Sequence, residues 1–151
     1  SSCKRISANE KSKKQITMEA KELRIGNYVN DHLGRIQKVS ETRSDSYICY
    51  LSNGTKLKYK LNTTKPIPLT EEWLVKFGFE KYKDTFQFKI ETIPYWSLGK
   101  EKQGCLKIYL TKTKKWKVGN LANKSIDIYS VNQLQNLYFA LTDKELKINK
   151  L

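Results

Sequence analysis

The sequence predicts an α+β protein, in which an N-terminal SH3-like strand unit is joined to a second antiparallel sheet carrying two short helices. Several short segments alternate apolar and polar residues with the period of two that is typical of half-buried strands. Two other segments have the apolar spacing and the capping residues of helices. The 151 residues, 38% of them hydrophobic, are enough for one core shared by both units.

Residues 1–17 are polar and basic and contain few side chains that a core could bury. We expect them to form a flexible arm whose lysines make secondary contacts with a partner. These lysines are Lys11, Lys13 and Lys14. Met18 is the only methionine, and we expect the folded protein to start there.

Residues 18–61 are expected to form the small SH3-like unit. Its predicted strands are Asn27–Asp31, Ile36–Glu41, Ser46–Leu51 and Lys56–Leu61. Asn53-Gly54 predicts a tight hairpin between the last two strands, because both residues tolerate the positive φ of a type I′ turn. The lysines of the last strand alternate with its apolar residues, and they are Lys56, Lys58 and Lys60. Short, strongly curved strands of this kind are typical of an SH3-like open barrel.

Residues 62–151 are expected to form an α+β unit that shares its core with the first unit. It opens with an extended linker over residues 62–69, because Pro66 and Pro68 fix their own backbone and restrict the preceding residues.

Two helices are predicted after the linker. Thr70 caps the first helix, and Gly78 ends it. Ser130 and Gln133 form a capping box at the start of the second helix. The apolar stripe of this helix consists of Val131, Leu134, Leu137, Tyr138 and Leu141.

The second sheet is predicted to begin with a hairpin about Asp84 and to continue after a loop over residues 93–104. Its strands are Phe79–Lys83, Thr85–Thr92, Cys105–Thr111, Trp116–Val118 and Ser125–Tyr129. A turn at Gly119-Asn120 separates the last two strands, and a final edge strand is expected over residues 146–148.

One apolar face of each of these elements contributes to the predicted core. The core residues are Ile36, Val39, Trp73, Leu74, Phe77, Phe86, Phe88, Leu134, Leu137 and Leu141.

The net charge of +14, from 29 Lys plus Arg against 15 Asp plus Glu, indicates an anionic partner. An alternative explanation is genomic composition. Only four of these basic residues are Arg, the residue that forks onto phosphates and guanine edges, and the rest are Lys.

The strongest candidate site is a lysine-rich segment between residues 100 and 117. Its members are Lys100, Lys102, Lys107, Tyr109, Lys112, Lys114, Lys115, Trp116 and Lys117. Lysines that follow a phosphate backbone, with aromatic side chains on which bases stack, are typical of single-stranded nucleic-acid binding. The alternative is a solvated strand face and turn, with Trp116 in the core.

Tyrosines in strand or loop positions are a second candidate, for a protein interface, if they are exposed. They are Tyr47, Tyr50, Tyr59, Tyr82 and Tyr95, and ordinary strand composition would also explain them.

The residues predict no catalysis, no cofactor and no small-molecule substrate. His32 is the only histidine, so a general-base mechanism through imidazole would depend on one residue in a predicted turn. Cys3, Cys49 and Cys105 lie far apart without a C-x-x-C motif, so we expect no metal site and reduced thiols in a bacterial cytoplasm. No apolar run is long enough to span a membrane.

Three motifs carry a family resemblance that covers roughly residues 21–148. They are Glu22–Val29 (ELRIGNYV), Pro66–Phe79 (PIPLTEEWLVKFGF) and Gln133–Thr142 (QLQNLYFALT). Together they resemble a group of small uncharacterised proteins of Bacteroidetes genomes, prophages and phages. The resemblance brings no catalytic residue and no cofactor, and it implies a mobile-element context.

Charge and resemblance together lead to the expected function. We expect a non-enzymatic phage or prophage protein that binds a host protein or protein–RNA complex through a basic surface. In that role it would inhibit a host defence ribonucleoprotein or nuclease, as an anti-CRISPR protein does. One alternative is a plain RNA- or DNA-binding accessory protein, and another is a structural component of the virion.

Overall fold

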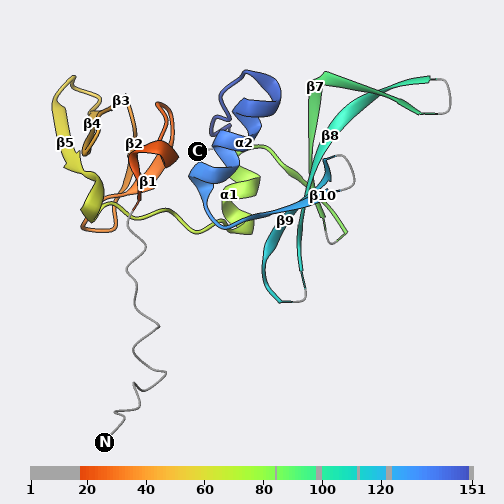
Figure 1. Cartoon of the computed structure of the whole chain (residues 1–151), viewed down its shortest axis with the longest axis horizontal. Coiled ribbons are helices and arrows are strands. Elements are labelled where there is room, and N and C mark those ends of the chain that lie inside the picture. Colours follow the sequence, from red (N-terminus) through yellow and green to blue (C-terminus); the bar gives the residue numbers. More distant parts are fainter. Residues whose placement is uncertain (1–17, 84, 98–99, 112, 122–123, 150–151) are drawn as a thin grey trace, which may run out of the picture.

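The structure is a computed structural model, which describes residues 18–149 apart from 84, 98–99, 112 and 122–123. Over residues 88–106 and 120–125 it describes the backbone alone. The predicted α+β class is confirmed, with an N-terminal strand unit, a second antiparallel sheet and two α-helices (Figure 1). No helix in the described part of the chain is long and apolar enough to cross a membrane.

The N-terminal unit contains two small antiparallel sheets. Strands β1 (Tyr28–Asn30) and β2 (Ile36–Lys38) form the first, and β3 (Glu41–Thr42), β4 (Ser46–Tyr50) and β5 (Lys56–Lys60) form the second. Short 3₁₀ helices, η2 (Ala20–Glu22) and η3 (Leu61–Thr63), flank these strands. The core of the N-terminal unit consists of Met18, Leu23, Val29, Val39, Tyr47, Cys49, Tyr59 and Leu61.

The hairpin at Asn53-Gly54 forms, but not with the predicted type I′ turn. Gly54 has a φ of +83°, whereas Asn53 is not among the described residues with positive φ. The Asn53 side chain instead accepts a hydrogen bond from the Thr55 amide, and Leu51 and Thr55 close the loop through their backbones. Asn53 therefore acts through its side chain, as in an Asx turn.

Ile36 was expected in the core with Val39, and this expectation is wrong. Val39 is buried, whereas Ile36 is 53% exposed. Because side chains alternate along a strand, two residues three positions apart cannot share a face of a regular strand. Gln37 is the residue of β2 that pairs with the buried Val29.

Helix α1 (Glu71–Lys76) starts and ends where the sequence predicts. The Thr70 hydroxyl accepts a hydrogen bond from the Trp73 amide, and Gly78 follows the last turn with a φ of +93°. The amides of Gly78 and Phe79 bond back to the carbonyls of the last turn, which is a Schellman arrangement. This end turns the chain directly into the second sheet.

The second sheet has the order β10-β9-β8-β7-β6. Its strands are β6 (Glu80–Tyr82), β7 (Thr85–Ser97), β8 (Lys100–Leu110), β9 (Trp116–Leu121) and β10 (Lys124–Ile128). The predicted loop over residues 93–104 is wrong, because β7 and β8 continue as one long hairpin. Pro94 lies within a register shift between Ile90 and Tyr95, which is where a sheet tolerates a residue without an amide hydrogen.

Two further boundaries differ from the prediction. Gly119 and Asn120 belong to β9 rather than to a turn, and the chain reverses after Leu121. The expected edge strand over residues 146–148 does not form. Leu146 is instead buried in the main core, and the Asn149 amide bonds to the Lys76 carbonyl at the end of α1.

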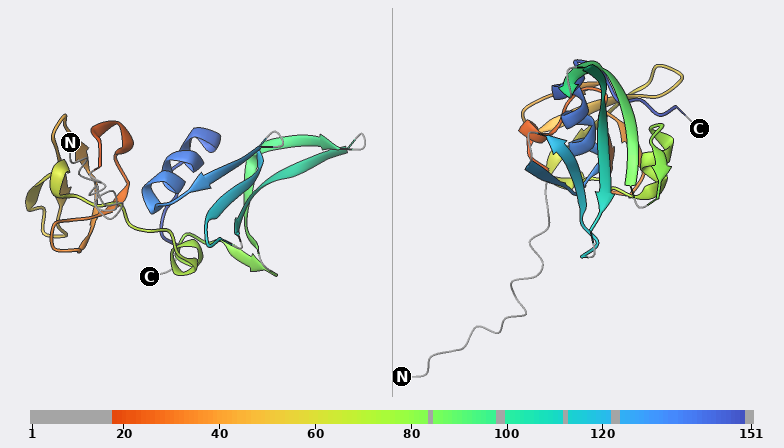
Figure 2. Two further views of the ribbon diagram at one scale, coloured as in Figure 1. Left: turned by 60° about the horizontal axis from the view of Figure 1, so that its bottom comes forward. Right: turned by 90° about the vertical axis from the view of Figure 1, so that its right-hand side faces the viewer.

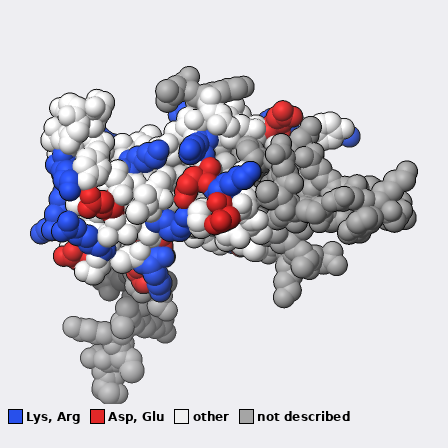
Figure 3. Space-filling view, turned by 90° about the horizontal axis from the view of Figure 1, so that it is seen from above, with Lys and Arg blue, Asp and Glu red and all other residues white. Residues whose placement is uncertain are grey.

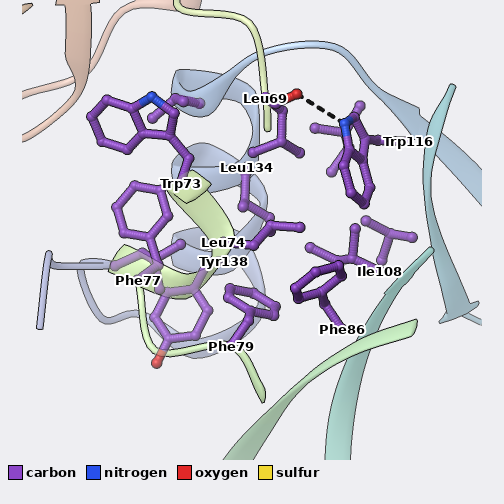
Figure 4. Close-up of a cluster of buried hydrophobic side chains, with 14 of the residues drawn as sticks. Leu69, Trp73, Leu74, Phe77, Phe79, Phe86, Ile108, Trp116, Leu134 and Tyr138 are labelled. Carbon is purple, nitrogen blue, oxygen red and sulfur yellow. Dashed lines mark hydrogen bonds between the residues drawn. The ribbon is translucent and has the colours of Figure 1, made fainter. Parts of the chain in front are cut away.

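Helix α2 (Val131–Thr142) lies with α1 on one face of the five-stranded sheet (Figures 1 and 2). The Ser130 hydroxyl accepts a hydrogen bond from the Gln133 amide, as predicted, but the Gln133 side chain bonds the Tyr129 amide instead of Ser130. The expected core residues Trp73, Leu74, Phe77, Phe86 and Leu134 are buried here, and Leu137 and Leu141 pack against them (Figure 4). The Phe88 side chain lies outside the described residues.

Polar contacts join α2 to the N-terminal unit. Gln135 is fully buried, and its side chain accepts from the Tyr28 amide at 2.9 Å and donates to the Gly26 carbonyl at 3.0 Å. The Asn136 side chain donates to the Glu22 carbonyl. Beside them the Arg24 guanidinium pairs with Glu145 at 2.8 Å and stacks on the ring of Phe139.

Candidate nucleic-acid interface

The five-stranded sheet has an inner face under the helices and an outer face that no described element covers (Figure 2). Phe86, Ile108 and Val118 point inward and belong to the core. Because side chains alternate along each strand, their neighbours lie on the outer face.

Two rows of residues cross this outer face in register. The first row consists of Tyr82, Thr85, Tyr109, Lys117 and Asp127. The second row consists of Glu80, Gln87, Lys107 and Gly119. The sheet therefore brings together three of the predicted site residues, Lys107, Tyr109 and Lys117.

The Tyr109 ring lies at the middle of the sheet, beside a glycine of the neighbouring strand. A Cβ atom added to Gly119 would lie 3.2 Å from Cε1 of the Tyr109 ring. The ring thus lies across the bare backbone of Gly119, a packing known to compensate for glycine in strands. Such a ring, half-buried on an open sheet face, is also what base stacking requires.

Trp116 is a core residue, which corrects its expected place on the binding surface. Its side chain is only 8% exposed, and its indole nitrogen donates to the Leu69 carbonyl at 2.8 Å (Figure 4). Its ring meets Phe86 edge to face, with centroids 5.9 Å apart. In this position the indole cannot stack on a base.

The predicted lysine-rich turn joins β8 to β9 at the end of the sheet where the first row lies. The backbone of Thr111 bonds to both Lys114 and Lys115, and the Thr111 hydroxyl accepts from the Lys115 amide. Lys114 has a φ of +57°, and Lys114 and Lys115 are both exposed. Lys112 lies outside the described residues.

A second turn brings another lysine to the same end of the sheet. Lys83 connects β6 to β7 with a φ of +54°, and its ammonium lies 5.8 Å from the ring centroid of Tyr82. We call Lys83, Lys114 and Lys115 the lysine rim. Tyr82 and Tyr109, in the row that borders these two turns, are the aromatic side chains next to the rim.

Charge on the outer face itself is nearly balanced. Lys117 pairs with Asp127 at 3.3 Å, and Glu80 lies in the same row as Lys107. Within the described part of the chain, the ammonium groups of the lysine rim make no ion pair. The rim therefore supplies the excess positive charge.

The remaining predicted lysines are not brought into this site by the described structure. Lys100 and Lys102 lie at the far end of β8, and their side chains are outside the described residues. Lys11, Lys13 and Lys14 also lie outside the described residues.

The tyrosine candidates divide into two groups. Tyr47 and Tyr59 stack on each other in the N-terminal core, and burial raises the pKa of Tyr47 to about 12. Tyr50 and Tyr82 are 44% and 63% exposed. The side chain of Tyr95 lies outside the described residues.

The residues that could support catalysis or metal binding are not grouped. His32 is exposed in the β1–β2 turn, and its neighbour Asp31 is buried and accepts hydrogen bonds from Leu33, Arg35 and Gln37. Burial raises the pKa of the Cys49 thiol to about 11, which keeps it protonated and a weak nucleophile. Among the described residues, no three His, Cys, Asp or Glu side chains are placed to hold a metal ion.

Sequence reasoning did not place Lys83 or Gly119 in this site, and it named Tyr82 only as a candidate for a protein interface. The hairpin about Asp84 was predicted, but which strands would lie beside it was not, so the meeting of its turn with the β8–β9 turn could not be foreseen. Searches against protein-family models, curated proteins and solved structures return no match for this chain.

Proposed function

We propose that this chain is a non-enzymatic binding protein whose partner is single-stranded RNA, alone or within a protein–RNA complex. The observation that supports it is the lysine rim next to Tyr82 and Tyr109 on an uncovered sheet face. Lysines neutralise phosphates, and aromatic rings stack on bases without reading their sequence. The binding is therefore expected to tolerate many sequences and to weaken as salt increases.

The proposed setting is the cytoplasm of a bacterial host, where the protein inhibits a defence ribonucleoprotein or nuclease in the manner of an anti-CRISPR protein. Guide RNA exposed by such a complex is a polyanion to which a protein with a net charge of +14 is attracted. The mobile-element resemblance supports this setting, and the surface supports the nucleic-acid contact. A plain RNA- or DNA-binding accessory protein would use the same surface.

The contact is tested by neutralising the rim. Asn suits the left-handed backbone of Lys83 and Lys114, so the variant Lys83→Asn, Lys114→Asn, Lys115→Gln keeps the turns. The affinity for a fluorescent single-stranded RNA is measured over a series of salt concentrations. The slope of log affinity against log salt concentration should be shallower by about 2 in this variant than in the wild type. A matched control with the same charge change replaces Lys65, Lys144 and Lys147 by Gln. These three lysines are exposed and lie outside the five-stranded sheet. Equal slopes in both variants would remove the rim from the proposal.

Stacking is tested separately at Tyr109. Tyr109→Leu keeps an apolar side chain over Gly119 but removes the aromatic face, and it should weaken RNA binding by about 1–3 kcal/mol. Tyr109→Phe should bind like the wild type. If Leu and Phe bind RNA equally well, the ring only covers the glycine.

A plain RNA-binding protein and an inhibitor of a defence complex differ in the partner that each of them needs. A plain binder holds naked RNA with a steep salt dependence, whereas an inhibitor also needs the protein part of its target. Capture from host cytoplasm followed by mass spectrometry should return a nuclease complex for an inhibitor. Recovery of capsid proteins alone would support a virion component instead.

A further inference from the structure

Strand β5 presents a second lysine-bearing surface, at the other end of the molecule from the five-stranded sheet (Figure 1). Lys56, Lys58 and Lys60 are exposed and alternate with Leu57 and Tyr59, which face the N-terminal core. Because alternate residues share one face, the three lysines stand about 7 Å apart in a straight line. In Figure 3, Lys and Arg side chains gather at this end of the molecule.

An aromatic side chain lies at one end of this line. Tyr50 of β4 pairs across the sheet with Lys56, and the Lys56 ammonium lies 5.3 Å from the centroid of its ring. The Tyr50 hydroxyl donates to Glu41, which fixes the ring while leaving the side chain 44% exposed. The sheet thus presents a fixed, accessible ring beside a row of ammonium groups.

The charge of this surface is positive after its acids are counted. Glu41 pairs with Lys56 at 3.4 Å and lies 3.9 Å from Arg43. Asp45 lines the same shallow hollow as Lys60, but no ion pair joins their side chains. Within the described residues, Lys58 and Lys60 make no ion pair, so this surface carries more positive than negative charge.

A structural role for these lysines is the main alternative. β5 is the edge of its sheet, and lysines on an edge strand discourage pairing with another chain. That role needs charge on the edge but no exposed aromatic ring in register with it. The ring of Tyr50 favours a ligand that has both phosphates and stacking bases.

We propose that β5, with Tyr50, is a second binding surface for single-stranded nucleic acid, so that one chain holds two strands, or two stretches of one strand, at its opposite ends. The surface rests on its own residues, and the idea of two strands on one chain rests in addition on the function proposed above. A molecule built in this way would link segments of RNA rather than only coat one.

The test uses the full chain and a single-stranded RNA of about ten nucleotides, a length within the footprint of one small binding surface. One batch of RNA carries biotin and another a fluorophore, so fluorescence captured on streptavidin reports two strands on one protein. The variants are Lys58→Gln with Lys60→Gln, the charge-preserving pair Lys58→Arg with Lys60→Arg, and the rim variant. The control pair is Lys65→Gln with Lys147→Gln.

The wild type, the arginine pair and the control pair should bind two strands and bridge them. The glutamine pair should bind one strand and lose at least tenfold of the bridging signal. If the glutamine pair bridges like the wild type, the proposal is wrong. If it self-associates with unchanged RNA stoichiometry, the lysines only protect the edge, and the proposal is equally wrong.

Two further results separate this proposal from the sheet-face function. If the rim variant binds one strand and loses it only when Lys58 and Lys60 are also replaced, both surfaces are supported. If the rim variant binds RNA like the wild type while the glutamine pair loses all binding, β5 remains a nucleic-acid surface and the sheet-face function fails. If polyglutamate binds through Lys58 and Lys60 and RNA does not, the partner of β5 is an acidic protein and the proposal fails.

Discussion

The two cores of this molecule are stabilised in different ways. The core under the five-stranded sheet is large and aromatic, with Trp73, Phe77 and Trp116 packed between the sheet and both helices. The N-terminal core is smaller, and buried polar groups such as Asn27, Asp31 and Thr64 accompany it. The difference teaches that the core under the five-stranded sheet depends mainly on apolar burial, whereas the N-terminal unit, with fewer buried apolar residues, depends more on hydrogen bonds whose geometry must be kept.

The largest effect is expected in the aromatic core. Trp116→Ala removes a buried side chain beside Phe86 and should lower the free energy of unfolding by about 3–5 kcal/mol, measured by chemical denaturation. Trp116→Phe keeps most of the packing but leaves the Leu69 carbonyl without its donor, so it should cost about 1–3 kcal/mol. A stable Trp116→Ala variant that has lost RNA binding would instead place Trp116 in the interface.

The next effect concerns the junction between the two units. Gln135→Ala leaves the Tyr28 amide and the Gly26 carbonyl without their buried partner and should cost about 1–3 kcal/mol. Hydrogen exchange should rise more over residues 18–61 than over the five-stranded sheet. Gln135→Met keeps most of the side-chain volume but makes neither hydrogen bond, so it separates the loss of the bonds from the loss of packing. Uniformly faster exchange over both units would show that the cores unfold as one.

Acid should weaken the N-terminal unit through Asp31. Burial opposes ionisation, but hydrogen bonds from Arg35, Gln37 and Leu33 outweigh it and hold the pKa of Asp31 below its ordinary value of 3.8. A lowered folded-state pKa contributes stability above the unfolded pKa, and this contribution is lost as pH falls through the folded pKa.

The wild type should therefore be more stable than Asp31→Asn at pH 7. The amide has one acceptor oxygen where the carboxylate has two, so either the Leu33 and Arg35 backbone amides or the Arg35 and Gln37 side chains lose their acceptor. The difference in unfolding free energy should shrink as pH falls below about 4. The measurement is urea denaturation at several pH values. A difference that stays constant from pH 7 to pH 2 would mean that the Asp31 charge has no part in stability.

The smallest effect is expected on the outer sheet face. Gly119→Ala places a methyl group against the Tyr109 ring, which can tilt into solvent, so stability should change by less than about 0.5 kcal/mol. RNA affinity should fall with the displaced ring, measured by fluorescence anisotropy. A loss of stability above about 1 kcal/mol would show that the ring is held more firmly than its exposure indicates.

The elements fixed by local chemistry could be predicted from the sequence. The cap at Thr70, the end at Gly78 and the cap at Ser130 each depend on a few neighbouring residues, and all three form as expected. The long hairpin could not be foreseen, because Pro94 and Gly99 are typical of loops and the register shift that accommodates Pro94 depends on the partner strand.

Prediction of the candidate site failed where the decision depends on which face of a strand is covered. Trp116 and Tyr109 are both aromatic residues of lysine-rich strands, and only the placement of the helices assigns one to the core and the other to the surface. The lysine rim depends on two turns that come from different hairpins, so no single stretch of sequence contains it.

The contacts of Gln135 also bear on the order in which the protein folds during its synthesis. The residues it joins are 107 and 109 positions apart in the chain. At ribosomal speeds of about 5–20 residues per second, the N-terminal strands wait roughly 5–20 s for the helix that completes them. During that interval the Tyr28 amide and the Gly26 carbonyl, which Gln135 later buries, must form their hydrogen bonds with water.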